Sequence, residues 1–349
     1  MTDRGGAYID ATAGDGGHST RVLERLSPQG KLFAFDCDPE AIRTSSENLK
    51  RFQPRFRLER SRFGELEGEL DKTGLAAVDG FLYDLGLRTS ALTDPQRGFS
   101  YSVEGPLDMR SDPDLSLTAA QVVNSLRQEE LAEIFLSYGE ERHSRRIAKN
   151  IVRRRGRSPL KTTYDLRDAV LEVIPKNLAV KTLSRVFQAL RLHINRDLEE
   201  LRIALEVAVR FLKPGGRMAI VLPQNKFNNA NTEYIRKFLF DKGRILAVVG
   251  LDTNTFKLPA PAKGTGTKTS ILFIQKWKEN EELLDDYPIF MATSERTGKN
   301  NSGEYIYKKD EHGNYIETED GQKVIDHDLD VIAEGFIKFA KEQNFDFWG

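Results

Sequence analysis

The chain has 349 residues, 39% of them hydrophobic and 30% charged, which is typical of a water-soluble globular protein with one large or two ordinary domains. Its apolar runs are too short to span a membrane, and its N-terminus lacks the apolar segment of a signal peptide, so a cytoplasmic protein is expected. The single cysteine, Cys37, excludes an internal disulfide framework and a cysteine-based zinc cluster.

Charge is distributed unevenly along the chain. Residues 278–349 contain 8 Lys and Arg and 18 Asp and Glu, a net charge of −10, whereas residues 1–277 contain 44 and 35, a net charge of +9. A basic body joined to an acidic C-terminal extension favours a polyanionic partner for the body. Charge alone leaves the identity of that polyanion open.

The first part of the chain alternates between short apolar runs and helical patterns. Strands are predicted over residues 7–10, 31–36, 56–59 and 78–84, and helices over residues 18–26 and 39–51. This alternation predicts a parallel sheet with helices on its faces.

The pattern changes after the fourth strand. Residues 117–195 show helical periodicity without a convincing strand, and a further helix from residue 196 is predicted to stop at Pro214-Gly215-Gly216. Three late strands follow over residues 217–222, 244–251 and 269–275, and a last helix lies near residues 329–341 in a polar tail with weak strand signals and no internal repeat.

The predicted class is therefore α/β, a Rossmann-like sheet interrupted by an all-helical insert of a length typical of a small subdomain. The division expected from these patterns has four parts: a first sheet-forming part, the insert, a second sheet-forming part and an acidic extension, over residues 1–112, 113–196, 197–277 and 278–349.

A glycine-rich turn, "DATAGDGGHS" from Asp10 to Ser19, joins the first strand to the first helix, which suggests a site for a small molecule. It lacks the Gly-Lys-Ser/Thr ending of a P-loop, and Ser19 stands where a dinucleotide fingerprint has its third glycine. Asp36 ends the second strand, where a carboxylate accepts two hydrogen bonds from a ribose diol. A compatible alternative makes Asp36 the N-cap of the helix that begins at Pro39.

Acidic residues end three of the predicted strands. Asp10, Asp36 and Asp84 are expected to form an acidic rim at the carboxyl edge of the sheet. Such a rim repels a pyrophosphate but suits the sulfonium and amino groups of S-adenosylmethionine (SAM). The turn is therefore predicted to bind SAM.

Four segments together resemble a known family. "DATAGDGGHS", "DLGLRTSALTDPQRGFSYSVEGPLDMRSDP", "YGEERHSRRIAKNIVRR" and "RVFQALRLHINRDLEEL" are similar to segments of the bacterial 16S rRNA cytosine-N4 methyltransferase family (RsmH, also called MraW), and the resemblance covers roughly residues 5–220. It implies a SAM-dependent methyltransferase with a Rossmann-like class I fold and a helical insert. By that resemblance, Gly16, Gly17 and His18 line the methionine end of SAM beside the turn residue Gly14. Asp36 would hold the ribose, Phe63 would lie by the adenine and Asp84 would face the reacting centre.

Two departures from this family follow. The family's Val-Ser-Ser-x-Gln after Asp-Leu-Gly is replaced here by residues 87–91, so that Ala91 stands in place of the glutamine. After Val221 the sequence instead resembles the C-terminal part of the modification subunit of type I restriction systems, an adenine-N6 DNA methylase. Those enzymes use Asn-Pro-Pro-Phe or a close relative, and this chain has no Pro-Pro dipeptide. The sequence is interpreted as a chimera on a shared scaffold.

In both families the acceptor is an exocyclic amine, a poor nucleophile that must be aligned with the methyl group while an oxygen draws on its N–H. Asp84, with backbone carbonyls near Gly86, is the predicted acceptor. In the loop that follows, Phe99 and Tyr101 are candidates for stacking on an extruded base, and Asp108 for polarising the amine. The alternative is that the aromatic residues anchor the loop and that Asp108 forms a local ion pair with Arg110. The loop candidates are Arg97, Phe99, Tyr101, Asp108 and Arg110.

An arginine-rich stretch lies within the insert. Residues 142–157 include eight basic residues, and their spacing predicts a phosphate-tracking stripe on one helix face. The alternative is a solvated face paired with Glu140 and Glu141. The residues expected to contact substrate are Arg145, Arg146, Arg153 and Arg154. His143 and His193 lack a ligand constellation, no metal site is expected, and Lys263–Lys268 is interpreted as a hairpin connection.

Three functions remain open at this point. The first is SAM-dependent methylation of cytosine N4 in small-subunit rRNA, a step of rRNA processing. The second is an adenine-N6 DNA methyltransferase subunit, and the third is a non-catalytic SAM-fold protein that binds nucleic acid. The missing Pro-Pro dipeptide favours the first over the second.

Overall fold

The computed structural model describes residues 3–224, 232–257, 268–279, 281, 284 and 286–345. They form two compact units. The first unit consists of residues 3–86, 202–257 and the described residues from 268 onward, and the second consists of residues 87–201. The division predicted from the sequence stays a prediction.

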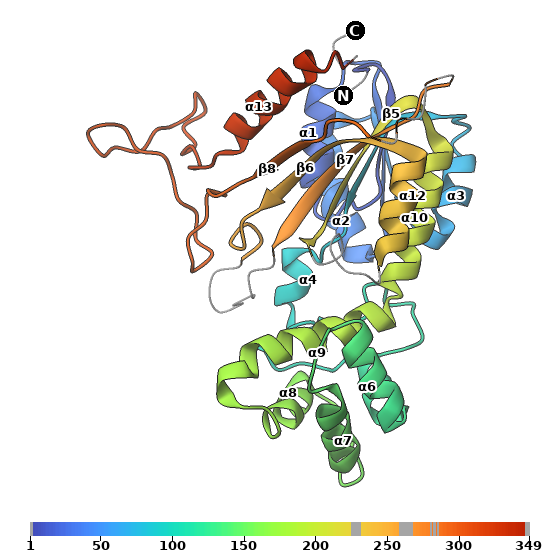
Figure 1. The fold of residues 1–349 in the computed structure, drawn as a ribbon, viewed down its shortest axis with the longest axis vertical. Coiled ribbons are helices and arrows are strands. Elements are labelled where there is room, and N and C mark those ends of the chain that lie inside the picture. Colours follow the sequence, from blue (N-terminus) through green and yellow to red (C-terminus); the bar gives the residue numbers. More distant parts are fainter. Residues whose placement is uncertain are drawn as a thin grey trace. The chain divides into compact units, whose positions relative to one another are not determined.

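One mixed sheet organises the first unit (Figure 1). Among the described residues its order is β3-β2-β1-β4-β5-β7-β6-β8, and all neighbouring strands are parallel except β7, which runs antiparallel to β5 and β6. The strands are β1 (Ala7–Asp10), β2 (Lys31–Asp36), β3 (Phe56–Arg60), β4 (Val78–Asp84), β5 (Leu212–Pro223), β6 (Gly243–Leu251), β7 (Thr269–Lys276) and β8 (Phe290–Thr293). The predicted α/β class is confirmed.

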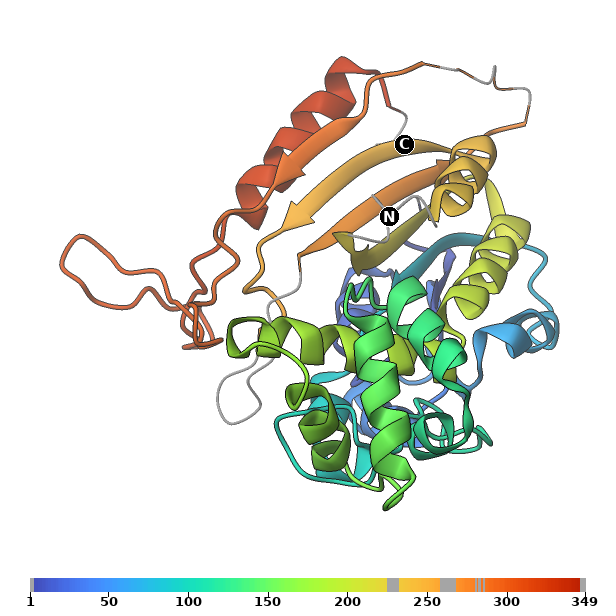
Figure 2. The same cartoon turned by 60° about the horizontal axis from the view of Figure 1, so that its bottom comes forward.

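Helices cover this sheet and bury its apolar side chains. Tyr8 and Leu32 of the sheet pack with Leu23, Leu49 and Phe52 from the helical segments that follow β1 and β2. At the other edge, α13 lies along β8 (Figure 2), where Phe336 and Phe339 contact Phe290. The helices are α1 (Gly17–Arg25), α2 (Pro39–Leu49), η1 (Lys50–Phe52), α3 (Phe63–Asp71), α10 (Asp197–Phe211), α12 (Glu233–Lys242) and α13 (Leu329–Glu342).

The second unit is helical, as predicted. Its helices surround an apolar core that includes Leu131, Phe135, Ile147, Leu166 and Phe187. Its described residues contain no strand, only an isolated bridge between Pro106 and Thr162. The helices are α4 (Thr89–Thr93), η2 (Pro95–Arg97), α5 (Ala119–Ser125), α6 (Gln128–Ser137), α7 (Ser144–Arg155), α8 (Thr163–Leu171), η3 (Lys176–Leu178) and α9 (Ala179–Ile194).

The predicted boundary between α10 and β5 was wrong by several residues. The helix ends at Phe211, and the Pro214-Gly215-Gly216 sequence lies inside the irregular first part of β5 rather than in front of it. Gly215 has φ +77°, and the register between β4 and β5 shifts between Val78 and Gly80. A turn sequence therefore forms a bulge here, because the strand continues on both sides of it.

Between β8 and α13 the chain makes three turns of the same design, with glycine at positive φ at Gly303, Gly313 and Gly321. Each glycine N–H donates to the carbonyl three residues earlier, at Asn300, Asp310 and Thr318.

Among the helices of the described residues, none has the length and hydrophobicity of a membrane span.

Candidate functional site

The glycine-rich turn has a backbone that only glycine adopts easily. Gly14 and Gly16 have φ +54° and +86°, and Gly16 is the N-cap of α1. A Cβ on Gly16 would lie 3.4 Å from the Ser45 Cα, whereas a Cβ on Gly17 would meet nothing within 4 Å. The turn is thus fixed on its α2 side and open at Gly17.

Asp36 is tied to this turn. One of its carboxylate oxygens, Oδ2, accepts from the Gly14 N–H, and the other, Oδ1, accepts from the Asp38 N–H, both at 2.9 Å. The alternative role of Asp36 as the N-cap of α2 was wrong, because Asp38 caps that helix by accepting from the Glu40 N–H at 3.0 Å. A carboxylate has about four lone-pair sites, so the side chain of Asp36 can accept from more than two donors.

Asp10 does not belong to an acidic rim, which corrects the sequence expectation. Its side chain is fully buried, and its Oδ2 accepts from the Ser19 hydroxyl at 2.6 Å. Burial raises the pKa of Asp10, and it outweighs the opposing hydrogen bonds from Ser19 and Thr12. Asp10 therefore supports the turn from below, and Asp36 and Asp84 remain as the accessible strand-end carboxylates.

Asp84 ends β4 and pairs with His18 from α1. The His18 Nε2 lies 3.3 Å from the Asp84 Oδ2, and the two side chains are 55% and 26% exposed. The hydrogen bond with Asp84 raises the pKa of His18. The backbone of Asp84 is held as well, since its N–H donates to the Thr12 Oγ1 at 2.7 Å and its carbonyl accepts from the Gly86 N–H at 2.9 Å.

Phe63, the predicted adenine neighbour, is half-buried at the start of α3. Its ring packs edge-on against Tyr83, with centroids 5.8 Å apart, and Tyr83 directly precedes Asp84. The Tyr83 hydroxyl donates to the Ala204 carbonyl at 2.7 Å inside the core. Phe63 is thereby anchored next to the end of β4.

These residues meet where the order of the sheet reverses. The chain passes from β1 to β2 on one side and later returns to β4 on the other, and the three strands are parallel. Ligands of open α/β sheets bind at the carboxyl ends of the strands at such a point. The open turn at Gly17, the diol acceptor Asp36 and the carboxylate of Asp84 fit a ligand with a ribose and a cationic centre, as SAM has.

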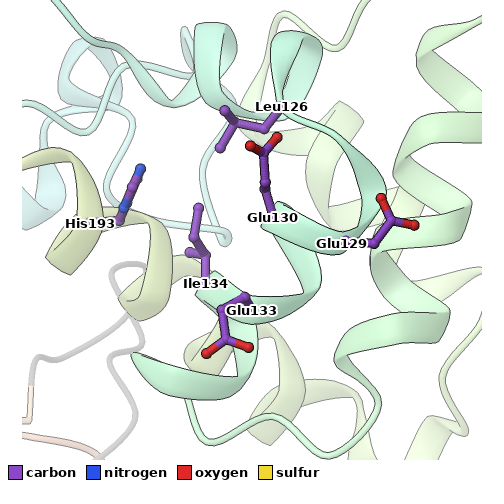
Figure 3. Close-up of a pocket in the computed structure, with 6 residues that line it drawn as sticks. All are labelled: Leu126, Glu129, Glu130, Glu133, Ile134 and His193. Carbon is purple, nitrogen blue, oxygen red and sulfur yellow. The ribbon is translucent and has the colours of Figure 1, made fainter.

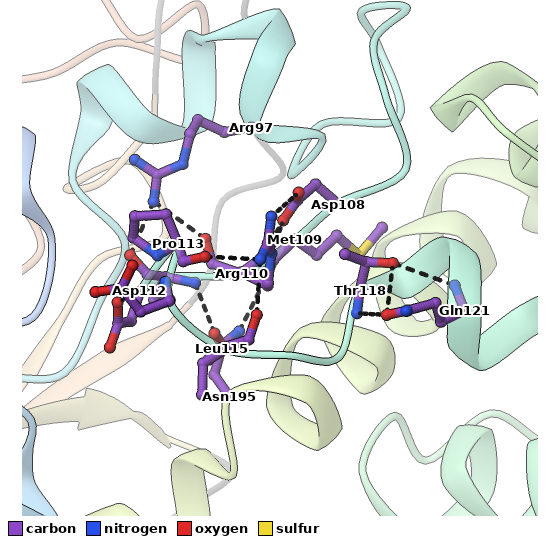
Figure 4. A network of polar contacts seen from close by, with 12 residues as sticks. Arg97, Asp108, Met109, Arg110, Asp112, Pro113, Leu115, Thr118, Gln121 and Asn195 are labelled. Carbon is purple, nitrogen blue, oxygen red and sulfur yellow. Dashed lines mark hydrogen bonds and ion pairs between the residues drawn. The ribbon is translucent and has the colours of Figure 1, made fainter.

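In the second unit, Asp108 and Arg110 form a two-pronged ion pair (Figure 4). Arg110 also donates to the Pro113 and Leu115 carbonyls at 2.7 Å. Partial burial disfavours the charge of Asp108, but the hydrogen bonds from Arg110 outweigh it and lower the pKa of this carboxyl. The predicted alternative, a local ion pair, is thus present, and Oδ2 keeps one further acceptor site.

The same loop is held by a residue at the end of α9 that the sequence analysis missed. The Asn195 Oδ1 accepts from the Ser111 N–H at 2.6 Å, and its amide donates to the carbonyl of Met109, a non-glycine residue at φ +64°. Arg97 donates to the Arg110 and Ser111 carbonyls. Asn195 lies in a segment quoted for the family resemblance, but nothing in its spacing indicated a long-range contact.

The two aromatic candidates lie against the helical core. Phe99 is 6% exposed, with the Arg97 guanidinium 5.7 Å from its ring centroid. Tyr101 packs edge-on against Phe187, and its hydroxyl lies 3.3 Å from the Ser184 Oγ. This packing is that of loop anchors, and a stacking role for either ring stays a prediction.

Helix α7 carries the arginine-rich stretch. Arg145, Arg146 and Lys149 are exposed, whereas Arg153 pairs with Glu172 and Asn150, and Arg154 is half-buried. Glu141 is not the partner expected for this face, because it is buried and pairs with Arg185 at 3.7 Å. Near the end of the stripe Arg153 is therefore paired with an acid, whereas no ion pair is found for Arg145, Arg146 or Lys149 among the described residues.

The helical unit also contains a shallow hollow of about 460 Å³ (Figure 3). Its lining is Leu126, Glu129, Glu130, Glu133, Ile134 and His193. Burial lowers the pKa of His193, in agreement with its expected structural role. Among the described residues no group of three or more His, Cys, Asp or Glu is arranged to hold a metal. Residues 263–267 of the predicted hairpin connection Lys263–Lys268 lie outside the described residues.

Comparison with known proteins gives two families. The MraW methylase family matches residues 1–245, and the N-6 DNA Methylase family matches residues 200–345. Ribosomal RNA small subunit methyltransferase H of Caldicellulosiruptor saccharolyticus is 40% identical over 239 residues, which are 68% of this chain and 76% of that protein. The protein of the same name from Chromohalobacter salexigens is 41% identical over 70% of this chain and 72% of that protein. Among solved structures, an rRNA methylase from Streptococcus thermophilus has a TM-score of 0.36 at 12% identity, covering 79% of this chain and 90% of that chain.

Proposed function

The chain belongs to the MraW methylase family, and we propose that it transfers the methyl group of SAM to the exocyclic N4 of a cytosine in small-subunit rRNA. It is a SAM-dependent methyltransferase, and both resemblances identified in the sequence are confirmed as family matches. The observation that carries the proposal is the position of Asp84, which ends β4 beside the glycine-rich turn and is held by His18 at 3.3 Å.

The cofactor would be held by residues of the first unit. Asp36 would accept from the ribose hydroxyls, Phe63 would border the adenine, and Gly14, Gly16, Gly17 and His18 would line the methionine end. When bound, SAM supplies a methyl group activated by a sulfonium centre. The positive φ values of Gly14 and Gly16 set the course of the turn, and the space beside Gly17 is open.

Asp84 would act on the acceptor base. The lone pair of an exocyclic amine is delocalised into the ring, and an acceptor for its N–H makes the nitrogen a better nucleophile. His18 occupies Oδ2 of Asp84, which leaves Oδ1 to accept from the amine. The carbonyl of Asp84 already binds the Gly86 N–H, so the backbone of this corner is fixed before substrate arrives.

The second unit would contribute to RNA recognition. Asp108 would accept from the cytosine amine at the acceptor site that Arg110 leaves open. Arg97, Phe99 and Tyr101 would shape the loop around Asp108. Arg145 and Arg146, with Arg153 and Arg154 further along α7, would contact phosphates. A cytoplasmic location, where ribosomes are assembled, belongs to the same proposal.

The two alternative functions are not favoured. The N-6 DNA Methylase match covers only the C-terminal part of the chain, and the chain contains no Pro-Pro dipeptide. The geometry of Asp84, His18 and the turn is intact, which argues against a protein that has lost its chemistry.

Methyl transfer from radiolabelled SAM tests this proposal, with purified 30S subunits and duplex DNA as parallel acceptors. We expect label in rRNA, and a loss of at least about 100-fold in Asp84→Ala, because the side-chain acceptor for the N–H is removed. Asp71→Ala, which alters an exposed acid at the end of α3, is the matched control and should retain activity. Label in DNA alone, or no label from protein that binds SAM, would contradict the proposal.

A further inference from the structure

The segment between β8 and α13 forms an arm of the first unit, drawn in orange in Figure 1. Its base is closed by Asp328, whose carboxylate accepts from the Ser294 hydroxyl at 2.5 Å and from the Glu295 and Arg296 N–H groups. The antiparallel bridge between Thr297 and His327 joins the two segments that form the stem of the arm. The arm is therefore an ordered structure with a fixed base.

Three hairpins branch within the arm. The bridges Lys299–Tyr305, Lys309–Tyr315 and Glu317–Lys323 each close a tight turn, and Tyr307–Ile325 continues the stem. Where the branches meet, Lys308 donates to Val324, Val324 to Ile316 and Ile316 to Lys308, all through backbone N–H groups at 2.8–3.0 Å. This closed triangle of hydrogen bonds fixes how the hairpins are arranged.

One side of the arm carries alternating tyrosines and lysines. Tyr307 lies between Tyr305 and Tyr315, with ring centroids 6.4 and 6.0 Å apart. Ammonium groups lie over these rings, with Lys309 at 5.1 Å and Lys323 at 4.1 Å from the centroid of Tyr315. We call this the tyrosine-lysine face, made of Lys299, Tyr305, Tyr307, Lys309, Tyr315 and Lys323.

The face is accessible and contrasts with the other side of the arm. Tyr305 and Tyr315 are 54% and 46% exposed, and side chains of neighbouring residues in a strand point the opposite way, as Ile306 and Ile316 do at 43% and 41% exposure. Glu317, opposite Lys323, is the acid paired across this side, and the acids Glu311, Glu319 and Asp320 lie in the turns. Lys299 donates to the Lys257 carbonyl, so Lys309 and Lys323 supply the available charge.

We propose that the tyrosine-lysine face is a docking surface for a single-stranded segment of the RNA substrate. The proposal rests on the proposed function for the choice of RNA, but binding at this face requires no methyl transfer. The face combines flat rings about 6 Å apart with ammonium groups between them. Proteins bind single strands with this combination, because bases stack on aromatic rings and phosphates contact the cations.

A duplex is a poorer match to this surface. Bases that are stacked inside a helix present no free face to a tyrosine ring, so stacking selects unpaired nucleotides. An apolar protein partner would be expected to favour the other side, where Ile306 and Ile316 are exposed and no lysine ammonium lies over an aromatic ring in the described contacts. The chemistry of the two sides therefore gives different predictions for the same arm.

Fluorescence anisotropy of a labelled RNA dodecamer with the full chain tests the proposal. We expect Tyr305→Ser with Tyr315→Ser to weaken binding at least about 25-fold, because each of the two stacked bases contributes at least a factor of about five. Tyr305→Phe with Tyr315→Phe should restore binding, since the rings remain. Lys309→Gln with Lys323→Gln should lower the salt dependence of log K by about 1.4.

The matched control is Ile306→Ser with Ile316→Ser, which alters equally exposed residues on the other side of the same hairpins and should leave the affinity within about twofold. Equal effects of the tyrosine and isoleucine pairs, or a preference for the duplex form of the dodecamer, would overturn the proposal. The proposal would also be overturned if the tyrosine double variant bound RNA normally and differed only in its molecular mass by light scattering. That result would indicate a contact between proteins. Methylation of 30S subunits, measured in parallel, distinguishes the docking proposal from the proposed function. Methylation without tyrosine-dependent RNA binding would contradict only the docking surface. Tyrosine-dependent RNA binding without methylation would contradict only the proposed function.

Discussion

The two glycines that begin α1 have different tasks, although they are adjacent in the sequence. Gly16 stands at φ +86° and would place a Cβ against Ser45 and Leu49, whereas Gly17 adopts helical backbone next to open space. Gly16 is needed for the fold of the turn, and Gly17 for room around it. A substitution pair can separate these tasks.

We expect Gly16→Ala to lower the free energy of unfolding by about 1–2 kcal/mol, the cost of left-handed backbone for an L-residue. Gly17→Ala should leave stability unchanged or raise it slightly, because alanine favours helix. Thermal and urea unfolding of both variants provide the measurement. Equal losses of unfolding free energy in the two variants would contradict this division of tasks between Gly16 and Gly17.

His18 should titrate above its ordinary pKa, because its hydrogen bond to Asp84 favours the protonated ring. The stabilisation from this pair is fully present below about pH 6.5 and is lost as the pH rises through the higher folded-state pKa. NMR titration of the histidine Cε1–H signals checks this, and Asp84→Asn should return the His18 value toward normal. His193, whose pKa is lowered by burial, is an internal control that should shift the other way.

Sequence reasoning singled out the strand-end carboxylates but was wrong about the exposure of Asp10 and about Asp36 as a helix cap. Asp10 ends a strand whose last three residues are all buried, so no alternation in the sequence showed which way its side chain points. Asp36 and Asp38 are two residues apart before Pro39, and both suit a cap; the structure gives the cap to Asp38 and leaves Asp36 for the turn. Such choices depend on contacts between distant segments, as Asn195 also shows.

Among the elements, α7 shows how one helix divides its charges. Its first two turns expose Arg145, Arg146 and Lys149, while Arg153 is fixed by Glu172 from the segment after α8. The stripe stays a prediction as a phosphate contact, and its first two turns carry the exposed residues Arg145, Arg146 and Lys149. The sequence could not show this, because Glu172 is distant along the chain.

Replacing Arg145, Arg146 and Lys149 together with glutamine should weaken RNA binding and lower the salt dependence of log K by about 2, at about 0.7 per phosphate contact on a single strand. Anisotropy titrations from 50 to 200 mM salt would measure this. Lys237→Gln, which alters an exposed lysine paired with Glu233 on α12, is the control and should leave the salt dependence unchanged. A salt slope that is unchanged in the triple variant would argue that α7 is only a solvated face.

Asp328 connects the arm, β8 and α13 through three accepted hydrogen bonds. Burial disfavours its charge, but the bonds from Ser294, Glu295 and Arg296 outweigh burial and lower the pKa of Asp328. Its stabilisation is therefore present above its unfolded-state pKa and lost as the pH falls through the lower folded-state value. Asp328→Ala should cost about 1–3 kcal/mol at pH 7 and much less near pH 2, which urea unfolding at both pH values would test.

At the scale of the whole molecule, the C-terminal part completes the sheet. Strand β8 pairs with β6, and Leu246 and Phe273 are covered by Phe336, Phe339 and Phe345. The late apolar runs were predicted as strands because their patterns are local. The sequence patterns did not indicate that β7 lies between β5 and β6. All three runs are similarly apolar, and the pairing of these strands depends on the complete sheet.

A chain that ends after Lys278 should aggregate and unfold at a lower temperature, because the edge of β6 and the apolar residues under α13 become exposed. The control replaces residues 299–325 with a short turn, which Thr297 and His327 permit because they already pair across the stem. This control keeps β8 and α13 and should unfold close to the intact chain. Light scattering and thermal unfolding of both proteins provide the measurement. A truncated chain that stays monomeric and unfolds at the temperature of the intact chain would show that the C-terminal part is dispensable for folding.

The separation of β4 from β5 has a consequence for synthesis on the ribosome. Asp84 and Val221 are paired neighbours in the sheet, yet the entire helical unit is translated between them. At roughly 5–20 residues per second, β4 waits on the order of ten seconds for its partner, and β5 and β6 then wait for β7. The helices can form from local contacts during this time. The nascent chain therefore holds β4 paired only with β1 while residues 85–221 are made, and this is the interval in which a chaperone would protect its open edge.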